Sequence, residues 1–502
     1  MSETNKNIMT YYEVDVSQFS ETAKLMKKMS ASLTAQWAVE GKQFFEVYAC
    51  YRTEEDFLIV KSLLPKDKPE FPSVSKIFLA ASRFERQIYS FMGIKALGNS
   101  DLRPWIKFAD WPADAWPLRK DFNSAQCLKR VKGEYAWIQA EGEGVNEIPV
   151  GPVHAGIIEP GHFRFQAVGE TIINLEERLG YTHKGIEKRF ESLGWLEGYK
   201  LAGRVSGDST VAHSLTYCRA LESMTDFTLP PRAAWLRAIF LERERIANHL
   251  GDIGAICSDA AFSIMLYQFM RLKEHFLRTN QTLFAHRFMM DCVVPGGVSV
   301  NISAEGAAQM TQELAALETE FERLVKIYDG NPSLEERVRD TGILSTKKAL
   351  EIGVVGVVAR ASGLNLDSRS LYPFAPYDKL QVKVPLYTAG DVNSRVWVRI
   401  EEVRESMRLL RELLADLPDT TIKVPCPLPE RNSTGFAVVE GWRGEVMYWL
   451  QATSAGTINR CMVRDPSAVN WLGLESAVID NIVPDFPLCN KSFNASYAGH
   501  DL

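Results

Sequence analysis

Apolar and polar positions in the first part of the chain follow patterns typical of both strands and helices. Residues 44–51 and 57–64 are rich in strand-forming side chains, and the polar segment 52–56 between them predicts a β-hairpin. A helix-like pattern follows over residues 73–89. The prolines of residues 101–122 then exclude a regular helix, and we expect this tail to wrap a neighbour in extended form.

The second part of the chain is mostly helical by the same criterion. Helix-spaced apolar positions predict three long helices, over residues 231–249, 303–328 and 396–417. Ser303 is suited to cap the second of these, and strand formers around Val438 and over residues 442–451 predict a small β element.

These patterns predict an α+β fold in two domains. The first covers residues 1–125 and ends in a Pro/Trp-rich tail, a polar connector covers 126–147, and a larger, mainly helical domain covers 148–502. With 502 residues the chain is long enough for each domain to bury its own core.

Composition and charge narrow the class of protein. Hydrophobic residues make up 46% and charged residues 24%, which is ordinary for a globular chain, and a net charge of −6 gives no reason to expect a nucleic-acid partner. No apolar run reaches the roughly 18–20 residues that span a bilayer. Residues 1–6 lack the basic and apolar regions of a signal peptide. We expect a peripheral protein on the cytoplasmic side of a membrane, held there by integral membrane subunits.

The cysteines do not form a local metal-binding pattern. There are eight of them, and no two are spaced as Cys-x-x-Cys. We expect scattered, reduced and mostly buried thiols.

Two short segments stand out because neither contains a cysteine. The first is residues 204–209, Arg-Val-Ser-Gly-Asp-Ser, and the second is residues 493–502 at the C-terminus. Each contains two small residues that are separated by two positions: Ser206 and Ser209 in the first segment, and Ser496 and Gly499 in the second.

Further motifs follow one another in a fixed order along the chain. In the first domain they are Arg83-Phe84-Glu85-Arg86, Asp101-Leu102-Arg103 and Pro117-Leu118-Arg119-Lys120-Asp121-Phe122. In the second they include Gly151-Pro152-Val153-His154, Glu159-Pro160-Gly161-His162, Tyr181-Thr182-His183-Lys184-Gly185-Ile186-Glu187-Lys188, Ala359-Arg360-Ala361-Ser362-Gly363 and Asp465-Pro466-Ser467.

With these motifs the chain resembles the large subunit of group 4 nickel–iron hydrogenases of the formate hydrogenlyase and hydrogenase-4 type. It is similar also to fused 30-kDa and 49-kDa subunits of respiratory complex I. The resemblance covers nearly the whole chain. It implies a 30-kDa-like α+β domain followed by a 49-kDa-like domain.

The resemblance places the four thiolate ligands of a nickel–iron centre at Ser206, Ser209, Ser496 and Gly499. A serine hydroxyl stays protonated near neutral pH and is a hard oxygen ligand, so it replaces a thiolate poorly. We therefore expect no metal or other cofactor in this chain and no hydrogen turnover by it alone. We also expect no C-terminal extension to be removed, because the chain stops at Leu502 just past the second segment.

Two residues of the second domain are candidates for proton transfer. Glu159 has the position of the hydrogenase proton-relay glutamate, and a buried carboxyl of raised pKa could pass protons without a metal. The alternative is a structural carboxylate paired with Arg164 or another cation. His154 matches the histidine that holds the quinone headgroup in complex I, whereas Gly207 replaces the tyrosine of that pair. A satisfied loop histidine is the alternative for His154.

Polar residues suggest a rebuilt cavity where the metal would lie. Arg204, Asp208 and His213 are on or near the first segment, and an Asp208–arginine ion pair would fill the space. Arg360 would lie near the iron ligands of a working enzyme, and burial of an unpaired arginine is costly. We expect it to pair with Asp208 or Asp501.

His183, Lys184 and Glu187 form a candidate coupling face. His183 and Glu187 are four residues apart and would share one face of a helix. In the complex I family this stretch faces the channel that leads to the membrane arm. A solvated or interface surface is the alternative.

Three functions stay open at this point. The first is a coupling subunit that docks on antiporter-like and heterodimerising membrane-arm subunits, contacts a small iron–sulfur subunit, and links electron transfer or ligand binding to proton or cation translocation. The second is a quinone-reducing oxidoreductase subunit that uses His154 and Glu159. The third is an oxoanion site formed by Arg204 and Arg360.

Overall fold

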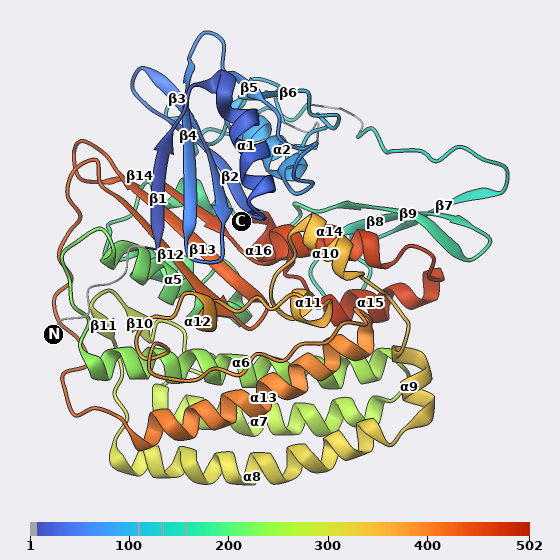
Figure 1. Cartoon of the computed structure of the whole chain (residues 1–502), viewed down its shortest axis with the longest axis vertical. Coiled ribbons are helices and arrows are strands. Elements are labelled where there is room, and N and C mark those ends of the chain that lie inside the picture. The colour runs from blue at the N-terminus through green and yellow to red at the C-terminus, as the bar shows by residue number, and fades with distance from the viewer. Residues whose placement is uncertain (1–7, 109–110, 132, 134, 156–157) are drawn as a thin grey trace.

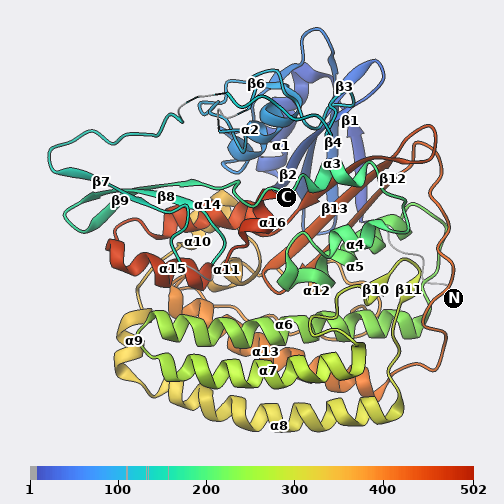
Figure 2. The ribbon, with the colours of Figure 1, turned by 180° about the vertical axis from the view of Figure 1, so that it is seen from behind.

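The chain places an N-terminal α+β unit on a second sheet, which in turn lies on a layer of long helices (Figures 1 and 2). This computed structural model describes residues 8–108, 111–131, 133, 135–155 and 158–502. The predicted α+β class, with a mainly helical second domain, is confirmed.

The N-terminal unit is a four-stranded sheet with two helices. Its strands β1 (Met9–Glu13), β2 (Ser32–Glu40), β3 (Phe44–Arg52) and β4 (Phe57–Pro65) are ordered β1-β4-β3-β2. Strands β3 and β4 form the predicted hairpin, in which Arg52 pairs with Phe57. Helices α1 (Phe19–Lys28) and α2 (Ala81–Met92) complete the unit, with the short strands β5 (Glu70–Pro72) and β6 (Lys95–Leu97).

The helix predicted over residues 73–89 is shorter at its start than expected. Helix α2 begins at Ala81, because the preceding segment bends around the Glu85 carboxylate. That carboxylate accepts hydrogen bonds from Val74 N at 2.8 Å and from Ser73 Oγ at 2.6 Å. Side-chain acceptors of this kind compete with helical hydrogen bonding.

The Pro/Trp-rich tail forms contacts with its own chain, and the expectation that it wraps a neighbour stays a prediction. Leu118 N donates to Phe91 O, and Arg119 Nε donates to Met92 O at 2.7 Å. Gly93, which ends α2 with φ of 69°, allows this approach, because a Cβ there would lie 2.8 Å from Trp116.

A three-stranded sheet extends sideways from the body (Figure 1). It consists of β7 (Val145–Val150), β8 (His162–Val168) and β9 (Thr171–Arg178) in antiparallel order. Phe163 and Phe165 on its inner face contact Phe486, with ring centroids 4.8 Å apart in both pairs. The loop between β7 and β8 lies beside the C-terminal segment, and therefore it contributes to the candidate site.

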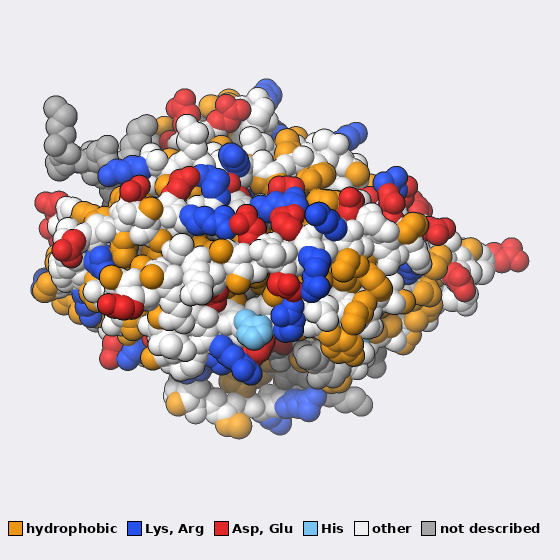
Figure 3. All heavy atoms as spheres, turned by 90° about the horizontal axis from the view of Figure 1, so that it is seen from below, with side chains coloured by type: hydrophobic (Ala, Val, Ile, Leu, Met, Phe, Trp, Pro, Cys, Tyr) orange, Lys and Arg blue, Asp and Glu red, His pale blue; other side chains and the backbone are white. Residues whose placement is uncertain are grey.

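Four long helices form the lower layer: α6 (Pro231–Asp259), α7 (Ser263–Phe284), α8 (Ala304–Asp329) and α13 (Val392–Ala415). Ser303 caps α8 as predicted, since its Oγ accepts from Gly306 N at 3.1 Å. Helix α6 runs ten residues beyond the predicted end at His249, and α7 was missed. Figure 3 shows acidic and basic side chains interspersed on this face, which ion pairs such as Arg271–Glu320 and Arg404–Glu322 join.

The predicted β element near the C-terminus is a three-stranded sheet of β12 (Thr434–Gly441), β13 (Gly444–Ala452) and β14 (Ile458–Arg464). It packs against the N-terminal sheet. Trp449 on β13 lies 5.3 Å from Trp37 and 5.0 Å from Tyr48, measured between ring centroids. The two domains therefore share a core.

Shorter elements connect these layers: α3 (Ile186–Phe190), α4 (Gly198–Ala202), α5 (Thr210–Glu222), β10 (Val293–Val294), β11 (Gly297–Val298), α9 (Pro332–Val338), α10 (Thr346–Ile352), α11 (Gly356–Ala361), α12 (Ser368–Leu371), α14 (Ser467–Ala477), α15 (Phe486–Phe493) and α16 (Tyr497–Asp501). The C-terminus lies between the N-terminal unit and the helical layer (Figure 1). Within the described ranges, no helix combines the length and apolarity required to cross a bilayer.

Candidate functional site

The two segments that lack cysteine meet in the interior. Ser206 lies just before α5, and Ser496 is the N-cap of α16. Their hydroxyl oxygens are 2.9 Å apart, and Ser496 Oγ also accepts a hydrogen bond from Gly499 N at 2.9 Å. Three of the four positions implied by the resemblance are thus joined to one another through hydrogen bonds.

An ion pair lies beside these serines. Arg443, on the turn between β12 and β13, donates from Nη1 and Nη2 to the two carboxylate oxygens of Asp208, each at 2.6 Å. Burial opposes the ionisation of Asp208, but the Arg443 guanidinium overcomes this effect and lowers the pKa of Asp208 to about 2. Ser206 Oγ and Ser209 Oγ also contact the Asp208 carboxylate, at 2.8 and 3.4 Å.

The fourth position, Gly499, lies against the carboxylate of Asp465. A Cβ at Gly499 would lie 2.6 Å from Asp465 Cγ and Oδ2, which is too close for any side chain. Asp465 Oδ2 is 3.0 Å from His213 Nε2, and His213 Nδ1 is 3.0 Å from the Tyr448 hydroxyl. All three side chains are almost completely buried. Although burial opposes it, the hydrogen bond with His213 lowers the pKa of Asp465.

These residues do not fit a four-thiolate metal centre. Three positions offer hydroxyl oxygens, which are engaged with Asp208 and with each other, and the fourth has no room for a side chain. Among the residues that the structure describes, no group of three or more His, Cys, Asp or Glu side chains is placed to hold a metal ion.

Glu244 lies directly behind the first segment. Its two carboxylate oxygens accept hydrogen bonds from Val211 N at 2.7 Å and Ala212 N at 3.1 Å, in the first turn of α5. Burial raises the pKa of Glu244 to about 8, against the opposing effect of these two bonds, and the nearby Asp208 raises it further. The sequence showed Glu244 only as part of a helix pattern.

Arg204 does not face the cavity, which corrects its predicted role. Its guanidinium is 45% exposed and pairs with Asp291 at 2.7 Å. The backbone carbonyl of Arg204, however, accepts a hydrogen bond from Lys184 Nζ at 3.2 Å.

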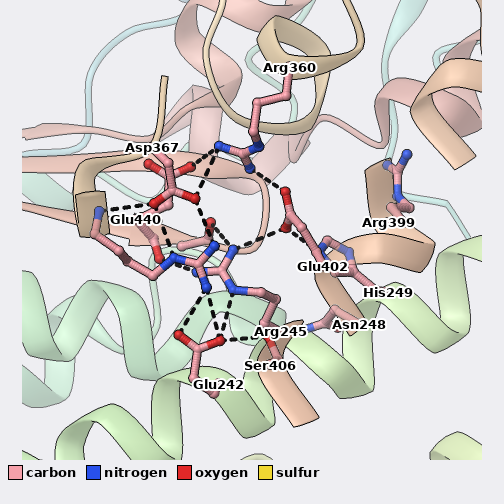
Figure 4. A network of polar contacts seen from close by, with 12 residues as sticks. Glu242, Arg245, Asn248, His249, Arg360, Asp367, Arg399, Glu402, Ser406 and Glu440 are labelled. Carbon is pink, nitrogen blue, oxygen red and sulfur yellow. Dashed lines mark hydrogen bonds and ion pairs between the residues drawn. The ribbon is translucent and has the colours of Figure 1, made fainter. Parts of the chain in front are cut away.

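Arg360 is buried in a separate ionic network (Figure 4). It pairs with Glu402 at 2.6 Å and Glu440 at 2.8 Å, so the predicted pairing with Asp208 or Asp501 is wrong. The oxoanion site is excluded as well, since neither Arg204 nor Arg360 has a guanidinium free to bind a ligand.

The same network contains His249, whose Nε2 is 2.7 Å from Glu402 Oε2. Arg245 joins Glu402 at 3.3 Å and Glu242 at 3.4 Å, so carboxylates and guanidinium groups alternate through the helical layer (Figure 4). Such an arrangement offsets the cost of burying each charge and holds α6 and α13 together.

His154 and Glu159 both contact α16 from the loop between β7 and β8. His154 Nε2 lies 3.2 Å from the Tyr497 hydroxyl, and Glu159 Oε2 accepts from Ala498 N at 3.0 Å. Glu159 is exposed, and Arg164 pairs with Glu147 instead. Both the buried carboxyl and the Glu159–Arg164 pair are therefore wrong. Burial, and to a lesser extent Lys491, lower the pKa of His154.

His183 and Lys184 hold the two segments in place. His183 Nδ1 is 2.7 Å from Asp501 O, and Lys184 Nζ donates to Val205 O at 2.7 Å. Helix α3 begins only at Ile186, and Glu187 turns inward to Arg460 at 3.1 Å. The predicted helical face shared by His183 and Glu187 is therefore wrong.

Asp501 anchors the end of the chain. Its carboxylate accepts from Gly180 N at 2.8 Å and from Thr182 Oγ1 at 2.6 Å. Its Oδ1 lies 2.8 Å from His500 Nδ1. Asp501 therefore fixes α16 to the loop after β9 and contributes no free charge to a cavity.

A groove of about 980 Å³ opens beside the same loop. Apolar and polar side chains of residues 111–130 line part of it, and residues 183–192 line the rest, with Lys184, Lys188 and the exposed Arg189 among them. His183 and Lys184 line this groove and are hydrogen-bonded to Asp501 and Val205, so that the groove lies next to both segments.

Comparison with known proteins matches the N-terminal and C-terminal parts of the chain to two subunit families. Residues 12–127 match the family described as respiratory-chain NADH dehydrogenase, 30 Kd subunit, and residues 259–434 match its 49 Kd subunit. Formate hydrogenlyase subunit 5 of Escherichia coli (strain K12) is 31% identical over 89% of this chain and 79% of its own length. The C/D component of the NADH-quinone oxidoreductase of Phocaeicola vulgatus is 29% identical over 84% of this chain and 85% of its own length.

A solved structure shares the fold. One chain of the membrane-bound sulfane sulfur reductase, an archaeal respiratory membrane complex, superposes with a TM-score of 0.68 at 23% identity, over 72% of this chain and all of that one. The chain therefore belongs to the family of fused 30-kDa and 49-kDa-type subunits that includes formate hydrogenlyase subunit 5 and the C/D component of NADH-quinone oxidoreductase.

Proposed function

We propose that this chain is a hydrophilic subunit of a membrane-associated complex and has no nickel–iron centre of its own. It would couple electron transfer or ligand binding to proton or cation translocation. Its relatives are subunits of respiratory and hydrogenase complexes, which supports the assignment to such a complex.

The observation that supports the proposal is that internal bonds occupy the place where the resemblance would put a metal. The Asp208–Arg443 pair and the Ser206–Ser496 hydrogen bond occupy the place where the two segments meet, and Asp465 leaves no space at Gly499. Charged and polar groups lie there, but no thiolate is among them. Such a site can respond to charge or protons but cannot bind nickel.

The proposed partners follow from the family resemblance. A small subunit would bring the iron–sulfur cluster, and the groove beside His183 and Lys184 is a surface where it could contact both segments. Antiporter-like membrane-arm subunits would hold the chain on the cytoplasmic side of the membrane.

Metal analysis of the purified complex tests the absence of nickel. We expect nickel well below one atom per complex, and iron only in the amount required by the partner's clusters. A variant with Ser206→Cys, Ser209→Cys and Ser496→Cys should also lack nickel, because Gly499 still supplies no ligand. Stoichiometric nickel in the parent complex would overturn the proposal.

Reconstitution in vesicles tests the coupling. We expect proton or cation uptake when the complex is reduced by its electron donor, and loss of this uptake when the chain is omitted. Unchanged uptake without the chain would contradict a coupling role.

A second candidate, reduction of a quinone-like acceptor, is favoured by one contact. Tyr497 and His154 form a hydroxyl–imidazole pair at 3.2 Å, although the tyrosine lies on α16 and not at Gly207, where the resemblance implied it. A headgroup that entered between them would find one donor and one acceptor. Tyr497→Phe should then lower the rate of quinone reduction without loss of assembly, whereas Tyr181→Phe should not. Equal rates in both variants would exclude this site.

A further inference from the structure

A small polar cavity lies where the N-terminal unit meets β9 and α16. Its volume is about 10 Å³, enough for about one water molecule. The residues that line it come from both domains: Arg83, Arg86, Trp105, Ile106, Phe108, Tyr135, Glu177, Arg178, Leu179 and His500.

Four residues that line this cavity each have a polar atom that is buried without a hydrogen-bond partner in the described part of the chain. These atoms are Arg83 Nη1, Glu177 Oε1, Arg178 Nε and His500 Nε2. Buried polar atoms are costly when unsatisfied, and internal water commonly bridges several of them. Four such atoms around one water-sized space indicate a site for bound water.

Two carboxyl groups share one arginine at the edge of the cavity. Arg83 Nη2 is 3.2 Å from Glu177 Oε2 and 2.8 Å from Glu475 Oε2. Glu475 Oε1 also accepts from Glu177 N at 3.1 Å, which keeps the two side chains together. The Glu177 side chain is 1% exposed, whereas that of Glu475 is 21% exposed. Two ionised carboxylates would therefore leave an excess negative charge at a buried position, which is unfavourable unless one of them binds a proton.

Two neighbouring arginines offset this negative charge only in part. Arg86 pairs with Asp101 at 3.0 Å, and Arg178 stacks on Phe108, with 4.0 Å from its Cζ to the ring centroid. Within the described residues, Arg178 forms no ion pair. The titratable and charged groups that face the pair are Arg83, Arg86, Tyr135, Glu176, Arg178, Tyr497 and His500.

The cavity is connected to the candidate site through α16. His500 contributes Nε2 to the cavity, and its Nδ1 lies 2.8 Å from Asp501, which is fixed to Thr182. Gly499 and Ser496 lie on the same short helix. A change in charge at the carboxyl pair would therefore act on α16, which carries Ser496 and Gly499.

We propose that Glu177 and Glu475 share one proton at neutral pH, and that water in the adjacent cavity exchanges this proton with solvent. The pair is then a proton store at the junction of the two domains. Burial and the mutual repulsion of the two groups raise the pKa of Glu177, which agrees with this assignment. The role of this proton in coupling rests on the proposed function. The presence of the proton on the carboxyl pair is independent of that function.

Infrared spectroscopy of the purified full-length protein tests the proton directly. At pH 7 we expect the carbonyl band of a protonated carboxyl, which shifts in heavy water because the cavity exchanges the proton. Glu177→Gln and Glu475→Gln should each remove one carboxyl's intensity from this band. Glu170→Gln, at the exposed turn between β8 and β9, is the matched control and should leave the band unchanged.

Two outcomes separate the proton store from the proposed function. If neither Glu177→Gln nor Glu475→Gln changes the band while both variants fold, the store does not exist. The parent alone also decides the case, since a complete lack of protonated carboxyl at pH 7 overturns the proposal even if a variant fails to fold. If Glu177→Gln and Glu475→Gln each lower the band by one carboxyl's intensity, but ion uptake by the vesicles stays at the level of Glu170→Gln, the store exists and its role in coupling is wrong.

Discussion

Arg443 and Asp208 form a bidentate ion pair in which two guanidinium nitrogens lie 2.6 Å from the two carboxylate oxygens. The geometry is that of the strongest hydrogen-bonded ion pairs in proteins. It joins the β12–β13 turn to the segment before α5, and therefore holds together the place where the two segments that lack cysteine meet. The ion pair thus has a structural role there, which leads to the first prediction.

Asp208→Asn should destabilise the fold by about 1–3 kcal/mol, because it leaves the buried Arg443 guanidinium without its counter-ion, while the 39% exposure of Asp208 lets solvent screen part of the pair. The matched control is Asp291→Asn, which breaks the exposed pair with Arg204 and should cost less than about 1 kcal/mol. Denaturant unfolding of the two variants and the parent measures both. Equal losses would contradict a special role for the Asp208–Arg443 pair.

Gly499→Ala should lower the thermal midpoint, since the added methyl group would overlap the Asp465 carboxylate and cost about 1–3 kcal/mol. Gly207→Ala is the control, because a Cβ at Gly207 meets nothing within 4 Å. Its midpoint should match that of the parent. A Gly499→Ala variant as stable as Gly207→Ala would show that Asp465 moves aside easily, and that a ligand at this position is not sterically excluded.

Glu159→Gln should fold and assemble like the parent. The glutamine oxygen can still accept the hydrogen bond from Ala498 N, and Glu159 is exposed, so the change in stability should stay within about 0.5 kcal/mol. Ion uptake by reconstituted vesicles then reports on proton transfer alone. A loss of uptake in Glu159→Gln, with normal uptake in the neighbouring Glu147→Gln, assigns a proton-carrying role to Glu159. Full uptake in both removes Glu159 from the mechanism.

More of the fold than of the candidate site could be predicted from the sequence. The hairpin of β3 and β4 and the cap at Ser303 depend on neighbours in the sequence, and both are found as expected. Helix α7 was missed, although it starts only four residues after α6 ends at Asp259, because one long apolar pattern gives no sign of the reversal between them.

Ion-pair partners were the least predictable feature. Asp208 was expected to pair with an arginine, but its partner lies 235 positions away, on a turn that no local pattern links to α5. Arg360 was expected near Asp208, yet it binds Glu402 and Glu440. Such choices depend on which elements pack together, and many carboxylates in one chain satisfy the same local rule.

Glu244 leads to a prediction about pH. Because the pKa of Glu244 is raised from 4.5 to about 8, the folded chain keeps a proton there that the unfolded chain releases. This contribution to stability is fully present below about pH 4.5 and is lost as the pH rises towards about 8, at up to about 1.4 kcal/mol per pH unit. Glu244→Gln cannot ionise, so the parent should lose stability relative to this variant as the pH rises from 5 to 8. The exposed Glu336→Gln should follow the parent at every pH. Parallel pH profiles for Glu244→Gln and the parent, measured by the thermal midpoint, would show that Glu244 is already ionised in the folded chain.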